Sequence, residues 1–201
     1  MIAIIDYGMG NIHSVAKALE AVGAEVLVTN KAQEIKNADK LVLPGVGAFG
    51  DAMQELEKQK LVKVIKEEIK RKKIFLGICL GMHLLFERSE ESPKIKGLGL
   101  LKGGVVRFPV KKELKVPHMG WNQVSPVNEC PLLKGVENGA FVYFCHSYYP
   151  VPQDKDVSAA VTDYGLNFSS VVWKGNIFGA QFHPEKSQSV GLKIIKNFVE
   201  M

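Results

Sequence analysis

Arginine is scarce in this sequence: only 3 of its 26 basic residues are arginine, and the other 23 are lysine. Recognition of bases and phosphates favours the bidentate guanidinium group. The net charge of +5 therefore does not by itself indicate a nucleic-acid partner. Many lysines alternate with glutamates between Lys58 and Lys73, which is typical of the solvated face of a helix. We expect a protein that binds no nucleic acid.

The sequence also lacks an apolar run near the roughly 20 residues that a membrane-spanning helix requires. It has no Cys-x-x-Cys pair, and its odd number of cysteines indicates free thiols in a reducing compartment. The N-terminal residues resemble a strand rather than a signal peptide. The five histidines are scattered and do not suggest a zinc site. We expect a cytoplasmic protein without membrane association, metal or cofactor.

The first half of the chain alternates apolar runs with amphipathic stretches. Strands are predicted at residues 2–5, 25–29, 40–43 and 74–78, and helices at 11–22, 51–73 and 80–88, the second of them broken near Gln59 and Lys60. Continuous apolar strands separated by helices predict a parallel sheet that is covered on both faces.

The second half contains mostly short strands, which are separated by turn residues. They are predicted at residues 98–108, 121–125, 141–146, 157–162, 169–173 and 177–182, followed by a helix at 191–199. We therefore expect an α/β fold with an open mixed, largely parallel central sheet, helices on both faces and an antiparallel extension. With no linker or repeat, residues 1–201 are predicted to form a single domain.

The pattern around Cys79 predicts a nucleophile. An apolar strand runs into this cysteine, a helix is predicted directly after it, and Gly77 and Gly81 stand two residues before and after it. This is the spacing of a nucleophile elbow with cysteine in place of serine. The helix N-terminus favours a thiolate, and the backbone N–H of Leu80 is placed to hold an oxyanion. The alternative is a buried structural cysteine, and the paired glycines favour the nucleophile.

A cysteine nucleophile needs a histidine as base and a third group that orients the histidine. His183 follows a predicted strand, and Glu185 lies two residues later, on the same side of an extended backbone. Pro184 favours that extended conformation at the residue before it. A histidine with no catalytic role in a polar loop is the alternative. No acidic residue stands two positions after any of the other histidines: His13, His83, His118 and His146.

Residues 45–50 match the glycine pattern of a dinucleotide-binding loop, Gly-x-Gly-x-x-Gly. Two features argue against a nucleotide: the pattern follows the third predicted strand, and the acids about 20 residues later lie within an amphipathic helix. The alternative is that Gly45, Val46 and Gly47 offer backbone N–H groups to an anion beside Cys79. We favour this oxyanion role.

The glycine loop, the Gly-Ile-Cys-Leu-Gly segment and the Phe-His-Pro-Glu-Lys segment occur in this order. Together they resemble the class I (triad) glutamine amidotransferases. Residues 6–11 (DYGMGN) and 117–122 (PHMGWN) are similar to the glutaminase subunits of imidazole glycerol phosphate synthases. The resemblance covers essentially the whole chain. It implies hydrolysis of L-glutamine and transfer of the ammonia to a cyclase subunit with a (β/α)8 barrel, in a heterodimer that serves histidine biosynthesis.

The resemblance also assigns roles to residues. It implies that Cys79 forms a glutamyl thioester, that His183 is the general acid and base, and that Glu185 is the partner of His183. Gly45, Val46 and Gly47 match an oxyanion strand that rearranges when the partner is occupied. Ser147 and His83 match substrate-binding positions. The implied interface with the cyclase consists of Asn11, His118, Met119, Trp121, Asn122, Tyr143 and Lys186.

Position 83 departs from the family, in which glutamine is usual. Histidine titrates near neutral pH, so we expect the affinity for glutamine to depend on pH. Three alternatives stay open: a glutaminase of another synthase, such as one for pyridoxal phosphate, a stand-alone cysteine peptidase with a similar triad, and a non-catalytic binding subunit. The segment 117–122 argues against another synthase, and a binding subunit would not need Cys79.

Overall fold

A computed structural model describes residues 1–109 and 114–201. The first half of the chain alternates strands and helices. In chain order these elements are β1 (Ile2–Ile5), α1 (Ile12–Ala21), β2 (Val26–Thr29), α2 (Ala32–Asn37), β3 (Lys40–Gly45), α3 (Phe49–Lys58), α4 (Leu61–Lys70), β4 (Ile74–Cys79) and α5 (Leu80–His83).

The second half is rich in strands and ends in a helix. It comprises β5 (Arg88–Ser89), β6 (Gly103–Arg107), β7 (His118–Pro126), β8 (Ala140–His146), β9 (Tyr148–Pro152), β10 (Ser158–Asp163), β11 (Asn167–Lys174), β12 (Ile177–Ala180) and α6 (Gln188–Glu200). Short 3-10 turns cover Pro131–Leu133, Lys155–Val157 and Pro184–Lys186.

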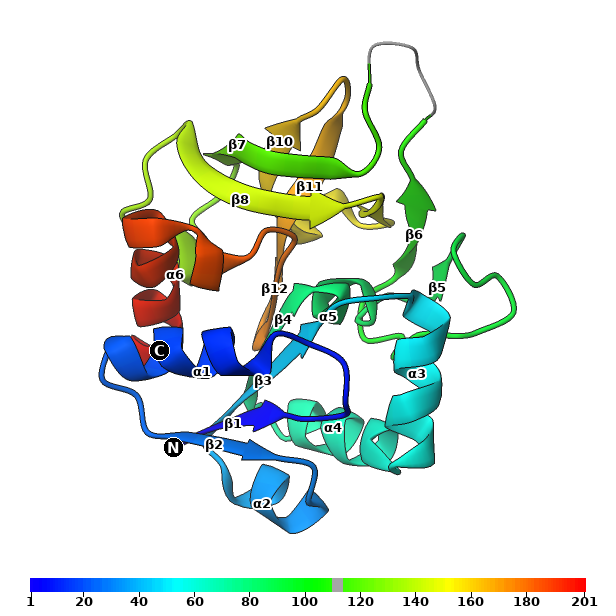
Figure 1. Ribbon diagram of the computed structural model, residues 1–201, viewed down its shortest axis with the longest axis vertical. Helices are drawn as coiled ribbons and strands as arrows, with labels where there is room; N and C mark the ends of the chain where they lie inside the picture. The colour runs from blue at the N-terminus through cyan, green and yellow to red at the C-terminus, as the bar shows by residue number, and fades with distance from the viewer. Residues whose placement is uncertain (110–113) are drawn as a thin grey trace.

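The main sheet has the order β2-β1-β3-β4-β12-β11-β10-β7-β8 (Figure 1). In the described residues, the pairings from β2 to β12 are parallel, and those from β12 to β8 are antiparallel. A smaller sheet joins β5, β6 and β9. The predicted mixed α/β fold class is confirmed, with an antiparallel part as large as the parallel one.

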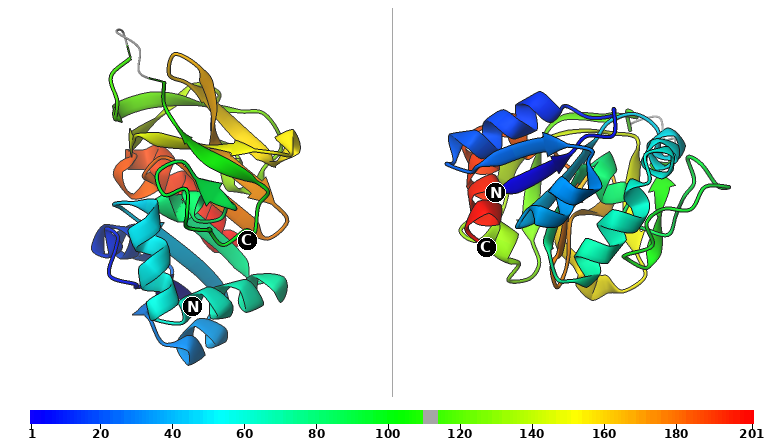
Figure 2. Two further views of the ribbon diagram at one scale, coloured as in Figure 1. Left: turned by 90° about the vertical axis from the view of Figure 1, so that its right-hand side faces the viewer. Right: turned by 90° about the horizontal axis from the view of Figure 1, so that it is seen from below.

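Helices cover both faces of the parallel strands, as the two turned views show (Figure 2). The residues of β1 explain why: Ala3 and Ile5 join one apolar cluster with α3 and α4, while Ile2 and Ile4 join the other with α1 and α6. All four residues are buried. A strand that packs against helices on both faces has no polar side, which accounts for the continuous apolar runs in the sequence.

The predicted break in the long helix is confirmed. Lys60 has a φ of 60°, in the left-handed region, and it separates α3 from α4. A residue in this conformation ends one helix and changes the direction of the next.

The helix predicted at residues 80–88 is wrong in length, because α5 ends at His83. The carbonyl groups of Leu84, Leu85 and Phe86 accept hydrogen bonds from backbone N–H groups of residues 98–101. These carbonyls are therefore not available to a continuing helix. The patterns also gave no prediction for α2 and β9, and β6 covers only part of the strand predicted at 98–108.

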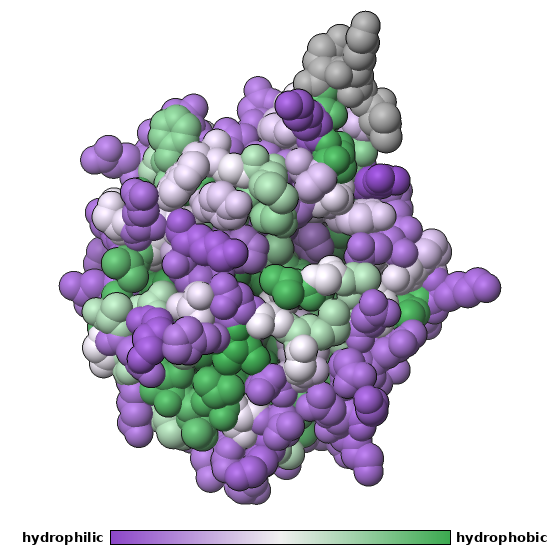
Figure 3. Space-filling view, in the orientation of Figure 1, coloured by the Kyte–Doolittle hydropathy of each residue, from purple (hydrophilic) through white to green (hydrophobic). Residues whose placement is uncertain are grey.

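Hydrophilic residues cover much of the face shown in Figure 3, and hydrophobic residues gather over the β1–β2 edge at its lower left. Val28 of the edge strand β2 is 43% exposed. None of the helices described is long and apolar enough to cross a bilayer. In the same residues, no group of three or more His, Cys, Asp or Glu side chains is arranged to hold a metal ion.

Candidate active site

The end of β4 bends sharply at Cys79. The backbone of this residue has φ 54° and ψ −109°, a conformation that residues with a side chain rarely adopt, and α5 begins at Leu80. Such strain is kept only where the surrounding structure enforces it. Here β4 is held between β3 and β12, so the bend is fixed by the sheet.

Gly77 and Gly81 are required by close backbone contacts around this bend. A Cβ atom on Gly81 would lie 1.8 Å from the carbonyl oxygen of Leu43, and one on Gly77 would lie 2.5 Å from that of Gly81. Both distances are far below van der Waals contact. The two glycines therefore let the first turn of α5 pack directly on the sheet.

His183 follows β12 in an extended conformation, and its Nδ1 lies 2.8 Å from Oε1 of Glu185. The side chains of these two residues are 5% and 1% exposed. Pro184–Lys186 form a 3-10 turn, so this turn, and not a continuing strand as the pattern suggested, brings the carboxylate to the imidazole.

The surroundings of His183 favour its protonated form. Burial alone lowers the pKa of a histidine, but interactions with the Cys79 sulfur and with Glu185 outweigh burial and raise the pKa of His183 to about 10. An imidazole in this setting stabilises a neighbouring thiolate and can return a proton to a leaving group. The thiol of Cys79 also lies 3.9 Å from the carbonyl oxygen of Cys145, at a length typical of a weak contact.

A cavity of about 320 Å³ joins these groups. Its walls come from the ends of β3, β4 and β8, from α5 and from the loop after β12. Its lining residues are Val46, Gly47, Cys79, Leu80, His83, Glu91, Pro117, Tyr143, Cys145, His146, Ser147, Tyr148, His183 and Lys186. A broader groove of about 690 Å³ lies beside β7 but contains no cysteine, so the chemistry belongs to the smaller cavity.

Of the predicted oxyanion residues, three line the cavity and one, Gly45, does not. Val46, 44% exposed, and Gly47, with a φ of 97°, line the cavity together with Leu80. Gly45 is buried at the end of β3, opposite Cys79, and does not line the cavity. A Cβ atom on Gly45 would lie 2.6 Å from the hydroxyl oxygen of Tyr7, so its role is to permit close packing.

A family model for class-I glutamine amidotransferases matches residues 3–201. The chain is 54% identical over 201 residues to the imidazole glycerol phosphate synthase subunit HisH of Caldanaerobacter subterraneus, covering 100% of this chain and 98% of the relative. The HisH subunit of Bacillus subtilis is 52% identical over 205 residues, with 100% and 96% covered. This chain belongs to the class-I glutamine amidotransferases, in the HisH subunit family.

The predicted family is thereby confirmed. A crystal structure of a glutamine amidotransferase superposes with a TM-score of 0.78 at 16% identity, covering 100% of this chain and 98% of that one. At this identity the likeness concerns the fold alone, and it agrees with the mixed sheet described above.

The environment of His83 contradicts the expectation that the imidazole of this residue titrates near neutral pH. His83 is 5% exposed, and its Nε2 lies 2.7 Å from Oε1 of Gln181. Burial lowers the pKa of His83 to about 4, with the hydrogen bond to Gln181 opposing it in part. The imidazole is therefore neutral at the wall of the cavity across the physiological range.

A His83→Gln variant is consequently expected to show the same pH dependence of the glutamine KM as the wild type between pH 6 and 9. Both side chains are uncharged there, since the pKa of His83 is about 4. The measurement is the KM at four pH values in each protein. A KM that rises below pH 7 in the wild type alone would contradict the neutral His83.

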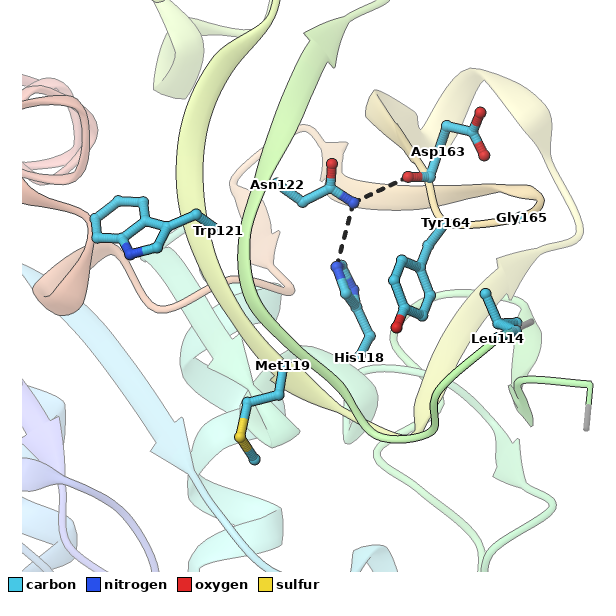
Figure 4. A pocket seen from close by; sticks show the side chains of 8 residues that line it. All are labelled: Leu114, His118, Met119, Trp121, Asn122, Asp163, Tyr164 and Gly165. Carbon is cyan, nitrogen blue, oxygen red and sulfur yellow. Dashed lines mark hydrogen bonds between the residues drawn. The ribbon is translucent and has the colours of Figure 1, made fainter. Parts of the chain in front are cut away.

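The residues predicted to face the cyclase are divided between two sides of β7 by the alternation of the strand. Met119 and Trp121 are 61% and 47% exposed. Figure 4 shows His118 and Asn122 pointing the other way, toward Tyr164. His118 is only 3% exposed, so it lies beneath the surface of this chain, and its assignment to the cyclase interface stays a prediction.

The buried side of β7 forms a continuous hydrogen-bond chain that the sequence patterns did not indicate. Asn122 Nδ2 lies 3.2 Å from His118 Nε2, and His118 Nδ1 lies 2.9 Å from His146 Nε2. His146 Nδ1 in turn lies 2.8 Å from the carbonyl oxygen of Tyr148. Since that carbonyl only accepts, His146 carries its proton on Nδ1 and the bonds run in one direction from Asn122.

Several residues at the site were not predicted, among them Glu91, His146 and Ser187. Glu91 and His146 line the cavity, and Ser187 lies behind His183. Glu91 also accepts a hydrogen bond from the backbone N–H of Phe49, at the start of α3. These residues lie far from the sequence motifs in the chain, or just after one of them, so the motif spacing gave no signal for them.

Of the remaining predicted residues, Ser147 lines the cavity. Asn11 instead caps α1, because its side chain accepts a hydrogen bond from the backbone N–H of Ser14.

Proposed function

We propose that this chain hydrolyses L-glutamine to glutamate and ammonia, and that it supplies the ammonia to a cyclase subunit that makes imidazole glycerol phosphate in histidine biosynthesis. The observation that supports this most is that Cys79 and His183 line one cavity, with Glu185 bonded to His183 from behind, in a chain of the HisH subunit family. A cysteine, an imidazole and a buried carboxylate supply a nucleophile, a proton carrier and its orienter.

The steps follow from the positions of these groups. The Cys79 thiolate attacks the side-chain amide carbon of glutamine, and the backbone N–H groups of Leu80 and Gly47 hold the resulting oxyanion. His183 gives a proton to the leaving nitrogen, which departs as ammonia, and a glutamyl thioester remains. His183 then takes a proton from water, whose oxygen displaces the thiolate and yields glutamate. His83 and Ser147, in the cavity wall, are proposed to hold the substrate. No metal or cofactor is required.

An exposed apolar surface next to the cavity supports a partner. Met119, Trp121 and Phe141 are 61%, 47% and 55% exposed on adjacent strands. Trp121 is paired with Tyr143, which lines the cavity, and Phe141 with Gln123. We define the β7–β8 face as Met119, Trp121, Phe141 and Tyr143. We propose that the cyclase covers it.

Lys186 and Asn11 complete the proposed contacts with the cyclase. The ammonium group of Lys186 lies 5.9 Å from the ring centroid of Tyr143, at the edge of the cavity. His118 and Asn122 point to the other side of β7, so they would support the interface from below and not contact the cyclase directly.

We also propose a single domain over residues 1–201 and a cytoplasmic location, which suits the three unpaired thiols.

The test is release of glutamate and ammonia from glutamine, assayed for the chain alone, with the cyclase subunit, and with the cyclase and its nucleotide substrate. We expect equimolar products and a rate that rises with each addition. Equal rates in all three mixtures would contradict coupling to the cyclase.

The same assay separates the alternatives. A stand-alone peptidase would cleave unstructured peptides without any partner, and we expect no such cleavage. A glutaminase of another synthase would respond to the synthase subunit for pyridoxal phosphate and not to the cyclase. A response to that subunit alone would leave glutamine hydrolysis in place and overturn the assignment to histidine biosynthesis.

A further inference from the structure

Ser187 occupies a position where serine normally caps a helix, but it does not do so. It precedes α6 as the N-cap residue, and its side chain makes no hydrogen bond to the first turn of that helix. An N-cap serine usually accepts from the N–H of the second or third helical residue. Ser187 is 1% exposed, so its hydroxyl group must find partners within the protein.

Those partners belong to the proposed base and to strand β8. The backbone N–H of Tyr143 donates to Ser187 Oγ at 3.0 Å, and Ser187 Oγ donates to the carbonyl oxygen of His183 at 2.7 Å. The N–H of His183 donates in turn to the carbonyl oxygen of Tyr143 at 2.9 Å. The three bonds form a closed ring that joins both backbone polar groups of residue 183 to those of residue 143.

The ring takes the place of sheet pairing at this point. β12 ends at Ala180, so His183 lies beyond the last residue of its own strand. β12 and β8 are not neighbours in the sheet, because β11, β10 and β7 lie between them. A hydroxyl group can accept one hydrogen bond and donate another, which a methyl group cannot do. Without it, the N–H of Tyr143 and the carbonyl of His183 lose this link.

We propose that Ser187 is a positioning residue for the reaction: its hydroxyl group fixes the main chain of His183 to β8 and so holds the imidazole at Cys79. This deepens the proposed function and rests on it. Because Tyr143 belongs to the β7–β8 face, the same ring connects the covered surface directly to the base. A partner that shifts β8 therefore shifts the backbone of His183 with it.

The test compares Ser187→Ala with Ser170→Ala in the complex with the cyclase. Ser170 is a matched control because it is 0% exposed and its hydroxyl has no partner among the described residues. For Ser187→Ala we expect kcat to fall about 10- to 100-fold, as for loss of alignment in a catalytic group, while the glutamine KM changes less than threefold. For Ser170→Ala both constants should stay at the wild-type values.

A second measurement does not depend on glutamine. The rate at which iodoacetamide alkylates Cys79, followed on the Cys79 peptide by mass spectrometry, should fall in Ser187→Ala and not in Ser170→Ala. A purely structural role predicts lower thermal stability with kcat and alkylation unchanged at temperatures where the variant is folded. That result, or a kcat within threefold of wild type, overturns the proposal.

The two measurements also distinguish failure of the proposed function from failure of the positioning role of Ser187. Absence of glutamine hydrolysis in the wild type would remove the proposed function, whereas unequal alkylation in the two variants would still support positioning of His183. If Ser187→Ala does not fold, Ser187→Cys replaces it, since a thiol is a weaker donor and acceptor than a hydroxyl. The same two rates should then fall by a smaller factor, and unchanged rates overturn the proposal.

Discussion

A Cys79→Gly variant is expected to lose glutamine hydrolysis and yet to be more stable than Cys79→Ala. The backbone of Cys79 has φ 54° and ψ −109°, which glycine adopts without steric cost. A residue with a Cβ atom is strained there by about 1–3 kcal/mol. Alanine keeps that strain, and glycine removes it. At an unstrained position within a strand, glycine would instead be the less stable of the two by roughly 0.5–1 kcal/mol.

The measurement is the free energy of unfolding in urea for both variants at one pH, with hydrolysis assayed in the presence of the cyclase. Hydrolysis should fall at least about 10⁴-fold in each, as when the nucleophile of a triad is removed. A more stable alanine variant would contradict the strained bend. Hydrolysis close to the wild-type rate in both variants would show that another group is the nucleophile.

The bend and its glycines were predictable because their signals are local. A buried strand that turns at once into a helix brings the backbone of that helix onto the neighbouring strand, and only glycine leaves room. The structure gives the reason in numbers, since a Cβ atom at Gly81 would lie 1.8 Å from the Leu43 carbonyl oxygen. The same locality holds for His183 and Glu185, which are separated by a single residue.

Features that depend on distant segments were not predictable. The end of α5 is set by residues 98–101, which take the carbonyls that a longer helix would use. The division of residues 118–122 between two sides of β7 follows from strand alternation, but only after the register with β8 is known. Ser187 looks like an ordinary helix cap until β8 is placed beside it.

The neutral state of His83 is another such feature. A free imidazole titrates near pH 6.5, and nothing in the flanking residues changes that expectation. The pKa falls to about 4 because the fold buries the ring beside Gln181, a residue 98 positions away. The family resemblance gave His83 a substrate-binding position, but burial decides the charge of its imidazole.

We expect the protein to lose much of its stability in mild acid, because three of its histidines are buried. His83, His118 and His146 are 5%, 3% and 6% exposed. Burial lowers the pKa of His83 and of His118 to about 4, and that of His146 well below its usual value. Between pH 4 and 6.5 the unfolded chain therefore binds more protons than the folded one, so stability falls as the pH is lowered.

The expected size of this effect is large. Each pKa unit corresponds to about 1.4 kcal/mol, so His83 and His118 together account for on the order of 6 kcal/mol at pH 4. That is comparable to the whole stability of a typical domain. The pKa of His183 is raised to about 10, so its contribution is fully present below pH 6.5 and is lost only as the pH rises toward 10. The contribution of His183 to stability therefore does not change between pH 4 and 6.5.

The measurement is the free energy of unfolding in urea at pH 7, 6 and 5 for wild type, His83→Gln and His13→Gln. His13 is exposed and serves as the control, with a curve parallel to the wild type. His83→Gln should lose less stability on acidification, because glutamine stays neutral in both states while His118 and His146 still resist protonation. Burial lowers the pKa of both, and His146 has a second reason: when protonated, its Nε2–H would face the Nδ1–H of His118 across the 2.9 Å bond that now joins them. Equal losses in all three proteins would show that the buried imidazoles do not control stability in acid.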